Sequence, residues 1–104
     1  MKILVFVGSH CPHCPVAVKV VNDVLREYRE YKITYEKIRT KTKSGKKLSG
    51  QYNITAVPTV IMLDEKGNEF KRITGAPKHS SLRSDVEQAL GIKKKSFFDR
   101  ILGR

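Results

Sequence analysis

The sequence predicts an α/β protein with one four-stranded mixed sheet and helices on both faces, and three observations carry this prediction. Two short, strongly apolar runs at residues 3–7 and 58–63 are typical of strands buried on both faces. Between them, apolar residues recur at helical spacing over residues 17–28. A turn sequence at residues 64–68 then returns the chain into an amphipathic strand.

The first half of the chain is expected to fold as strand, helix, strand. Residues 3–7 form the first strand, and the apolar stripe predicts a helix over about residues 11–30. Pro12 and Pro15 would break a helix interior but are tolerated in a first turn. The helix is therefore expected to begin at the C-P-H-C sequence itself, with Cys11 at its start. This unit implies a parallel strand pair joined by a right-handed crossover.

The second half of the chain supplies the remaining elements. We expect a strand over residues 33–39, a basic loop over 41–51 leading to a short helix near Leu48 and Tyr52, a strand over 58–63, and an edge strand over 69–74. A final helix is expected to be capped by Ser80 and closed by Gly91.

The chain is expected to hold one domain over residues 1–91 and an extension over residues 92–104, because 104 residues correspond to about one domain. Ser96 and Asp99 give a helix-capping signal, so the extension is predicted to form a short, basic, amphipathic helix. Such a helix is too short to be stable alone and must pack on something. Packing onto the body is the first expectation, and a partner, a second copy or an anionic membrane surface are the alternatives.

Positive charge is concentrated in two places. The chain has 21 basic and 10 acidic residues, a net charge of +11, and residues 37–47 hold six basic side chains and no acid. Residues 91–104 hold five basic residues and one acid. Residues 37–47 are expected to be a solvated face, with docking of an acidic redox partner as the alternative. Binding of nucleic acid is disfavoured, because no aromatic residues are interleaved with the charges to stack on bases.

The apolar runs also bear on location. No run approaches the about 18 apolar residues of a membrane span. The first apolar run is shorter than the about 7–15 residues of a signal-peptide core. Secretion and membrane insertion are therefore disfavoured, and a cytoplasmic location is expected.

The two cysteines, Cys11 and Cys14, stand in a C-P-H-C sequence. A single C-x-x-C pair in a cytosolic chain points to redox or metal chemistry. Cys11 precedes the first helical turn, where the positive end of the helix stabilises a thiolate, whereas Cys14 is more covered. This inequality predicts a nucleophile, Cys11, and a resolving thiol, Cys14. His13, when protonated, would stabilise the thiolate further.

Two other interpretations of the cysteine pair stay open. A zinc site would need two further ligands, which His10, His13 or the distant His79 could supply. A purely structural disulfide is the other alternative. His79 is otherwise expected to be a surface residue near a helix cap.

The sequence resembles the thioredoxin/glutaredoxin superfamily over about residues 2–91. The resemblance rests on G-S-H-C-P-H-C-P after an apolar strand, T-A-V-P-T about 45 residues on, and a glycine after the following hairpin. It is most similar to the short glutaredoxin-like thioredoxins of archaea, which lack the extra N-terminal strand and helix of full-length thioredoxins. The resemblance therefore implies a thioredoxin fold.

The resemblance also implies roles for individual residues. Cys11 matches the attacking cysteine and Cys14 the resolving one, while Pro12 and His13 match the variable inner pair that tunes the redox potential. No cofactor is implied beyond a redox-active Cys11–Cys14 disulfide.

Three further positions match the family's substrate-binding surface. Pro58 matches the cis-proline beside the active site, and Val57 matches the residue whose backbone is offered to the substrate chain. Gly75 matches the glycine that leaves room for the substrate backbone.

The sequence departs from the family pattern at three places. His10 stands where the family has a tryptophan, and Val5 stands where full-length thioredoxins have a buried aspartate that helps deprotonate the resolving cysteine. Another route to that deprotonation is therefore needed, through His10, His13 or water. The Pro-His inner pair is shared with strongly oxidising periplasmic disulfide catalysts, so we expect a less reducing protein than thioredoxin.

The expected function is a cytoplasmic protein-disulfide oxidoreductase that most simply reduces protein disulfides through a mixed disulfide. A reductase or a low-molecular-weight thiol would supply the electrons. One alternative is a glutathione-dependent glutaredoxin, in which the basic loop holds the glutathione carboxylates. Another is a thioredoxin-fold binding module whose basic surface docks an acidic partner.

Overall fold

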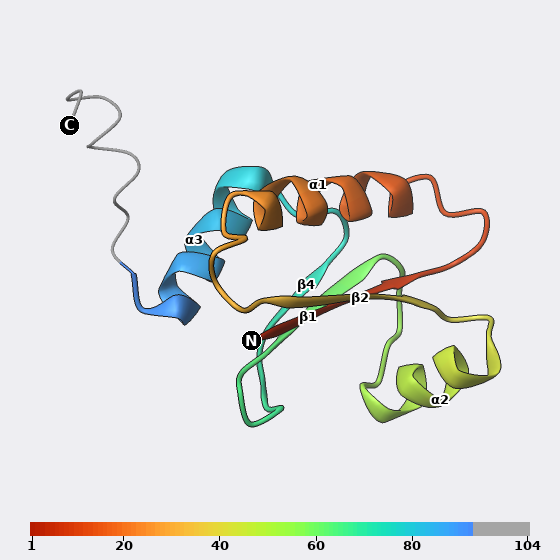
Figure 1. Cartoon of the computed structure of the whole chain (residues 1–104). Coiled ribbons are helices and arrows are strands. Elements are labelled where there is room, and N and C mark those ends of the chain that lie inside the picture. Colours follow the sequence, from red (N-terminus) through yellow and green to blue (C-terminus); the bar gives the residue numbers. More distant parts are fainter. Residues whose placement is uncertain (93–104) are drawn as a thin grey trace.

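The computed structural model describes residues 1–92 of the chain. Seven elements follow one another: β1 (Lys2–Val7), α1 (Cys14–Arg26), β2 (Thr34–Arg39), α2 (Lys43–Gln51), β3 (Thr59–Leu63), β4 (Glu69–Thr74) and α3 (His79–Leu90) (Figure 1). This order confirms the predicted α/β class. The helix expected within residues 92–104 falls on residues 93–104, outside the described part of the chain.

The four strands form one mixed sheet in the order β2-β1-β3-β4. β1 pairs parallel with β2, while β1–β3 and β3–β4 are antiparallel. Figure 1 shows α1 and α3 over one face of the sheet and α2 on the other. The parallel pair is joined through α1, because parallel strands need a crossover and cannot be joined by a tight turn. The predicted four-stranded mixed sheet is confirmed.

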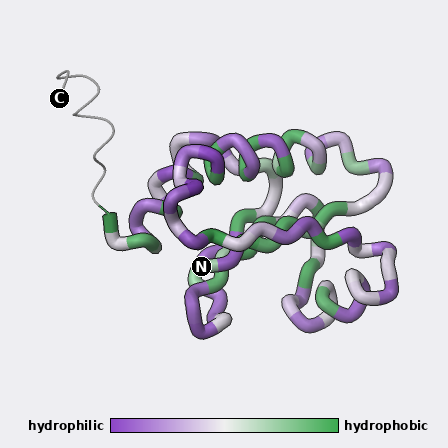
Figure 2. Tube along the Cα trace, in the orientation of Figure 1, coloured by the Kyte–Doolittle hydropathy of each residue, from purple (hydrophilic) through white to green (hydrophobic). Residues whose placement is uncertain are grey.

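Alternating side chains of β1 fill two cores, one on each face of the sheet. Ile3, Val5 and Val7 lie in the cluster under α1 and α3, whereas Leu4 and Phe6 lie in the cluster under α2. Figure 2 shows the hydrophobic residues gathered along these central strands. Because β1 and β3 are buried on both faces, their sequences are continuously apolar rather than alternating.

The ends of α1 differ from the expectation of about residues 11–30. The helix begins at Cys14, and the Cys14 N–H donates to the Cys11 carbonyl oxygen at 3.2 Å in the preceding turn. Pro15 occupies the first helical turn, where its missing N–H costs nothing, so only one of the two prolines lies inside the helix. The helix ends at Arg26, because Tyr28 turns into the core and its hydroxyl donates to the buried carboxylate of Glu87 on α3.

Part of the expected basic loop is helical. The helix α2 spans Lys43–Gln51, so it begins earlier than the short helix predicted near Leu48 and Tyr52. The Thr42 side chain accepts a hydrogen bond from the Gly45 N–H and so caps the first turn. Lysine is a good helix former when its charge reaches water, so a basic sequence does not prevent a helix here.

The start of α3 and the start of β3 also differ slightly from expectation. The N-cap of α3 is Lys78, without a side-chain cap, so Ser80 lies inside the first turn and does not cap the helix. Gly91 closes α3 in the left-handed region at φ +70°, as predicted. Pro58 lies immediately before β3 and not within it. None of the described helices is long and apolar enough to cross a membrane.

Candidate active site

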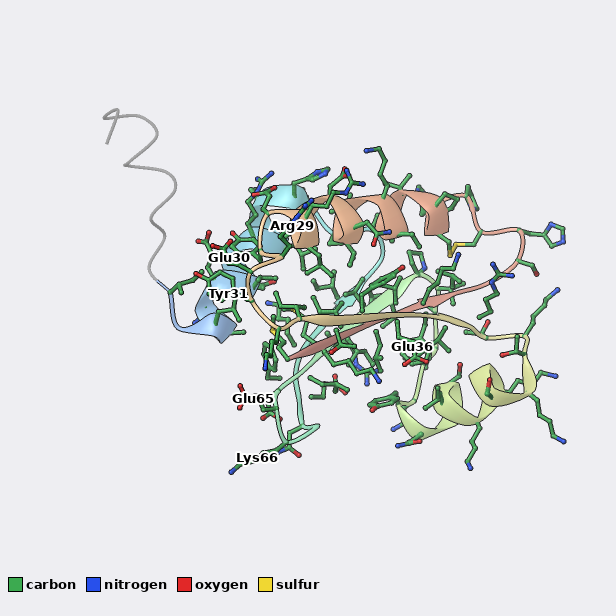
Figure 3. The ribbon with its side chains drawn as sticks, viewed as in Figure 1. Arg29, Glu30, Tyr31, Glu36, Glu65 and Lys66 are labelled. Atoms are coloured by element: carbon green, nitrogen blue, oxygen red, sulfur yellow. A yellow bond between two sulfur atoms is a disulfide. The ribbon has the colours of Figure 1, made fainter. Side chains whose placement is uncertain are left out.

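A disulfide joins Cys11 to Cys14 in the turn between β1 and α1. In Figure 3 it is the yellow bond near the start of α1. Cys14 is only 4% exposed, whereas Cys11 is half-buried. A sulfur of an incoming molecule can therefore reach Cys11 but not Cys14.

The inner pair of the motif faces solvent. Pro12 and His13 are both exposed, and His13 is the N-cap residue of α1 without a side-chain cap. The first turn of α1 has no acidic residue to offset the positive end of the helix. These conditions stabilise a thiolate at Cys11 when the disulfide is reduced.

A second segment, residues 56–58, lies against the turn that carries the cysteines. The Val57–Pro58 peptide bond is cis, and Val57 is 36% exposed while Pro58 is buried. A Cβ placed on Gly8 would lie 3.0 Å from Cγ2 of Val57, so the two segments are in close contact. The structure thus brings Val57 and Pro58 to the cysteine turn, as the resemblance implies.

Gly75 lies beside Pro58. Its N–H donates to the Pro58 carbonyl oxygen at 2.8 Å, and its φ is +91°, a backbone conformation that favours glycine. A Cβ on Gly75 would meet no atom within 4 Å. In the free protein the glycine is therefore required by the backbone angle, and the space beside it is open.

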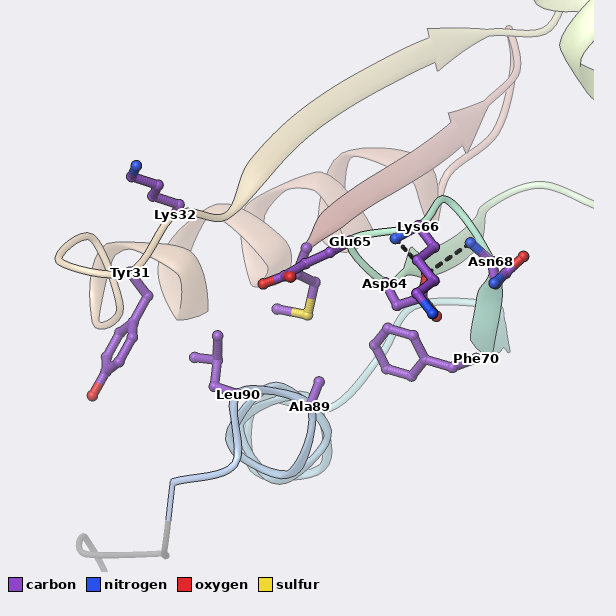
Figure 4. Close-up of a pocket in the computed structure, with 10 residues that line it drawn as sticks. Tyr31, Lys32, Asp64, Glu65, Lys66, Asn68, Phe70, Ala89 and Leu90 are labelled. Atoms are coloured by element: carbon purple, nitrogen blue, oxygen red, sulfur yellow. Dashed lines mark hydrogen bonds between the residues drawn. The ribbon is translucent and has the colours of Figure 1, made fainter.

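A hollow of about 520 Å³ opens at the disulfide, between α1 and the strands β1 and β2. It is lined by Val7, Gly8, His10, Cys11, Cys14, Pro15, Val18, Lys19 and Lys37. A larger hollow, of about 720 Å³, includes Tyr31, Phe70 and Leu90 in its lining but neither cysteine (Figure 4). Any reaction of the two cysteines therefore takes place at the smaller hollow.

The matching family model is described as a thioredoxin domain and covers residues 1–86. The chain belongs to the thioredoxin family. It is 31% identical to a thioredoxin of Methanocaldococcus jannaschii over 90 residues, which are 86% of this chain and 96% of that protein. It is 34% identical to a Methanothermobacter marburgensis protein named "Probable Thioredoxin" over 82 residues, which are 79% of this chain and 87% of that protein.

Solved structures agree with the family assignment. Thioredoxin 1 of Thermosipho africanus superposes with a TM-score of 0.72 at 25% identity, covering 88% of this chain and 96% of that one. The thioredoxin fold expected from the resemblance is therefore confirmed. Together with the Cys11–Cys14 pair, the family makes this protein a thiol-disulfide oxidoreductase.

The histidines considered as zinc ligands form no metal-ligand group with the cysteines within the described part of this thioredoxin. His79 lies at the start of α3, where its Nε2 is 3.3 Å from Oδ2 of Asp23 on α1. It is a surface residue, as expected, but it also links the two helices. Within residues 1–92 no three side chains of His, Cys, Asp or Glu are grouped as metal ligands would be.

Two features near the site were not predicted from the sequence, namely the backbone conformation of His10 and the position of Lys37. His10 adopts φ +57°, in the left-handed region that residues other than glycine rarely occupy. Lys37 lines the hollow beside the disulfide, although the sequence marked it only as the start of a basic run. Strand alternation could have found it, because Tyr35 and Lys37 share a face and Tyr35 contacts the core under α1.

Proposed function

We propose that this thioredoxin reduces disulfides of other proteins in the cytoplasm. One observation carries the proposal: among the described residues, neither the N–H nor the carbonyl of Val57 makes a backbone hydrogen bond. Val57 is also exposed, and it lies against Gly8 in the segment that leads to Cys11. Unpaired backbone groups on an exposed segment can pair with an extended substrate chain. Such pairing would hold a substrate disulfide next to the accessible sulfur.

The reaction follows from the unequal cysteines. The thiolate of reduced Cys11 attacks one sulfur of the substrate disulfide; the substrate S–S bond breaks, a mixed disulfide forms, and the departing substrate thiolate takes a proton from solvent. Cys14 then loses its proton and attacks the Cys11 sulfur. This step forms the Cys11–Cys14 disulfide and releases the second substrate sulfur as a thiolate. The substrate gains two electrons and this protein loses two.

Three residues are proposed to hold the substrate. The Val57 backbone would pair with it, the cis peptide at Pro58 would present that backbone, and the open space at Gly75 would admit the substrate chain. The proposal needs no cofactor beyond the Cys11–Cys14 disulfide. A reductase or a low-molecular-weight thiol would restore the dithiol.

The deprotonation of Cys14 must use groups other than a buried carboxylate. Val5 occupies the position of the family's aspartate and is completely buried among apolar side chains. His10 and His13 are both exposed near the disulfide, and water reaches Cys11. We propose that one of these groups accepts the proton.

The basic surface over residues 37–47 supports docking of an acidic protein partner. Of its six basic side chains, none forms an ion pair within the described part of the chain. Other basic residues, such as Lys2 and Arg83, are paired with carboxylates. Because the positive field of residues 37–47 is uncompensated, it would speed encounter with an acidic substrate or reductase.

Reduction of a disulfide-bonded protein by the wild type, Cys11→Ser and Cys14→Ser variants tests the proposed function. We expect Cys11→Ser to lose all activity and Cys14→Ser to accumulate a mixed disulfide, seen as a mass increase that dithiothreitol reverses. Turnover by Cys11→Ser at the wild-type rate would overturn the proposal.

A further inference from the structure

The hollow beside the disulfide is lined by two lysines and a histidine, which come from three parts of the fold. His10 comes from the β1–α1 turn, Lys19 from α1 and Lys37 from β2. The remaining lining residues are apolar side chains, Gly8 and the two cysteines, and none is Asp or Glu. The hollow therefore combines access to the reacting sulfurs with positive charge.

The sheet register places Lys37 at this hollow. Lys37 lies opposite Val5 in the parallel β1–β2 pair. Its neighbour Ile38 packs into the core under α2, so Lys37 occupies the face covered by α1. Because Val5 is an apolar, completely buried side chain, the strand beside Lys37 offers it no carboxylate.

The charge of Lys37 is uncompensated, unlike that of Lys19. Lys19 forms an ion pair with Asp23 at 2.8 Å, whereas no carboxylate of residues 1–92 lies within ion-pair distance of Lys37. The positive end of α1 adds to the field at the same place. An anion entering the hollow would meet the charge of Lys37 without competition from a carboxylate of residues 1–92 at ion-pair distance.

We propose that this hollow is an anion subsite that selects disulfides carrying a carboxylate or similar anion close to the reacting sulfur. The inference rests on the proposed function and specifies its substrate class. A thiolate at Cys11 repels an anionic disulfide, and the ammonium group of Lys37 offsets that repulsion. The anion can belong to a small acidic disulfide or to an acidic side chain next to a substrate cysteine.

Three small disulfides of similar size test the subsite: dithiodipropionate, which is dianionic, hydroxyethyl disulfide, which is neutral, and cystamine, which is dicationic. The measured quantity is the rate constant for oxidation of the reduced protein by each disulfide at low salt. The anion-to-cation ratio of these rate constants is compared between proteins, so the intrinsic reactivity of each disulfide cancels.

Lys37→Gln is expected to lower this ratio by about fivefold, the size of a partly exposed ion pair. Lys66→Gln is the matched control, because it removes the same charge at the β3–β4 turn, far from the disulfide in Figure 3. Lys37→Arg keeps the charge and should keep the ratio. An unchanged ratio in Lys37→Gln, or an equal change in Lys66→Gln, overturns the subsite.

The neutral disulfide separates this inference from the proposed function. If the reduced wild type does not react with hydroxyethyl disulfide at all, thiol-disulfide exchange itself fails. If it reacts but the ratio does not depend on Lys37, only the subsite fails. Peptide disulfides with Asp or Lys beside the cysteine then identify the source of the anion. A Lys37-dependent preference for the Asp peptide indicates acidic protein substrates. A preference confined to dithiodipropionate indicates a small acidic disulfide.

Discussion

At the scale of single residues, the two cysteines of the disulfide differ in how far they are exposed to solvent. Cys14 is buried in the core under α1, while Cys11 lies at the surface beside exposed Pro12 and His13. A thiolate at Cys11 is stabilised by the helix end and by any positive charge on His13. We propose that the inner pair stabilises the thiolate of the nucleophile, Cys11.

Replacing His13 tests this role directly. We expect His13→Val to raise the pKa of the Cys11 thiol, because the thiolate loses a neighbouring side chain that can carry a positive charge. A less stable thiolate destabilises the reduced form, so the couple should also become more reducing. Titration of the thiolate absorbance gives the pKa, and an unaltered value would remove His13 from the mechanism.

The sequence was sufficient to predict which residues form the centre of the site. It did not predict which side chains and backbone conformations surround them. The C-P-H-C spacing and the V-P-T sequence were sufficient to locate Cys11, Cys14 and Pro58. The position of Lys37 beside the disulfide depends on the register between β1 and β2, which is a long-range property. The left-handed backbone of His10 could not be predicted from its residue type, because only a small fraction of histidines adopt it.

At the scale of elements, α2 is fixed to the end of β2 by a close backbone approach. A Cβ on Gly45 would overlap the Arg39 carbonyl oxygen, whereas a Cβ on Gly50 in the same helix would meet nothing within 4 Å. The Thr42 hydroxyl donates to the same Arg39 carbonyl at 2.9 Å. The start of the basic helix thus depends on a glycine for space.

These two glycines give a matched pair of variants. Gly45→Ala is expected to destabilise the protein by roughly 1–3 kcal/mol, because the backbone must shift to admit the methyl group. Gly50→Ala should stabilise it by about 0.5–1 kcal/mol through helix propensity alone. Urea unfolding of both variants measures the difference; equal effects would mean that α2 does not approach β2 this closely.

The helices α1 and α3 are linked by a cluster of polar side chains centred on Asp23. Its carboxylate lies 2.8 Å from Lys19, 3.3 Å from Arg26 and 3.3 Å from His79. The hydrogen bond from Lys19, followed by that from His79, lowers the pKa of Asp23 below its ordinary value of 3.8. Because the folded-state pKa is the lower one, the cluster stabilises the fold above about pH 4, and this stabilisation is lost as the pH falls through the folded-state pKa.

Asp23→Asn should therefore have a lower melting temperature than the wild type at pH 7, and the difference should shrink as the pH is lowered below 4. Thermal unfolding followed by circular dichroism at several pH values checks this. A difference that stays constant with pH would show that the carboxylate charge is not what matters at this position.

Element types were more predictable than element ends. The apolar runs of β1 and β3 follow directly from burial on both faces, so the sequence predicted them well. The end of α1 depends on Tyr28 contacting Glu87, 59 residues away, and no local pattern reports such a contact. Burial and this hydrogen bond also raise the pKa of the Tyr28 hydroxyl.

At the scale of the whole molecule, the Cys11–Cys14 disulfide and the basic residues 37–47 lie at the same end of the sheet. The parallel β1–β2 pair carries the cysteine turn at the end of β1 and the basic residues 37–47 along β2 and into α2. An acidic protein drawn to this surface would arrive beside Cys11.

Because exposed charges are screened by salt, we expect the rate of reduction of an acidic protein substrate to fall as ionic strength rises, while that of a neutral small disulfide changes little.

The most direct test of the redox centre is the equilibrium reduction potential of the Cys11–Cys14 couple at pH 7 in a defined thiol buffer. We expect a reversible two-electron couple lying above the about −270 mV of thioredoxin and below the about −120 mV of strongly oxidising catalysts, because the Pro-His pair stabilises the Cys11 thiolate. Failure to form any reversible Cys11–Cys14 disulfide would contradict the assignment of these two cysteines as a redox centre.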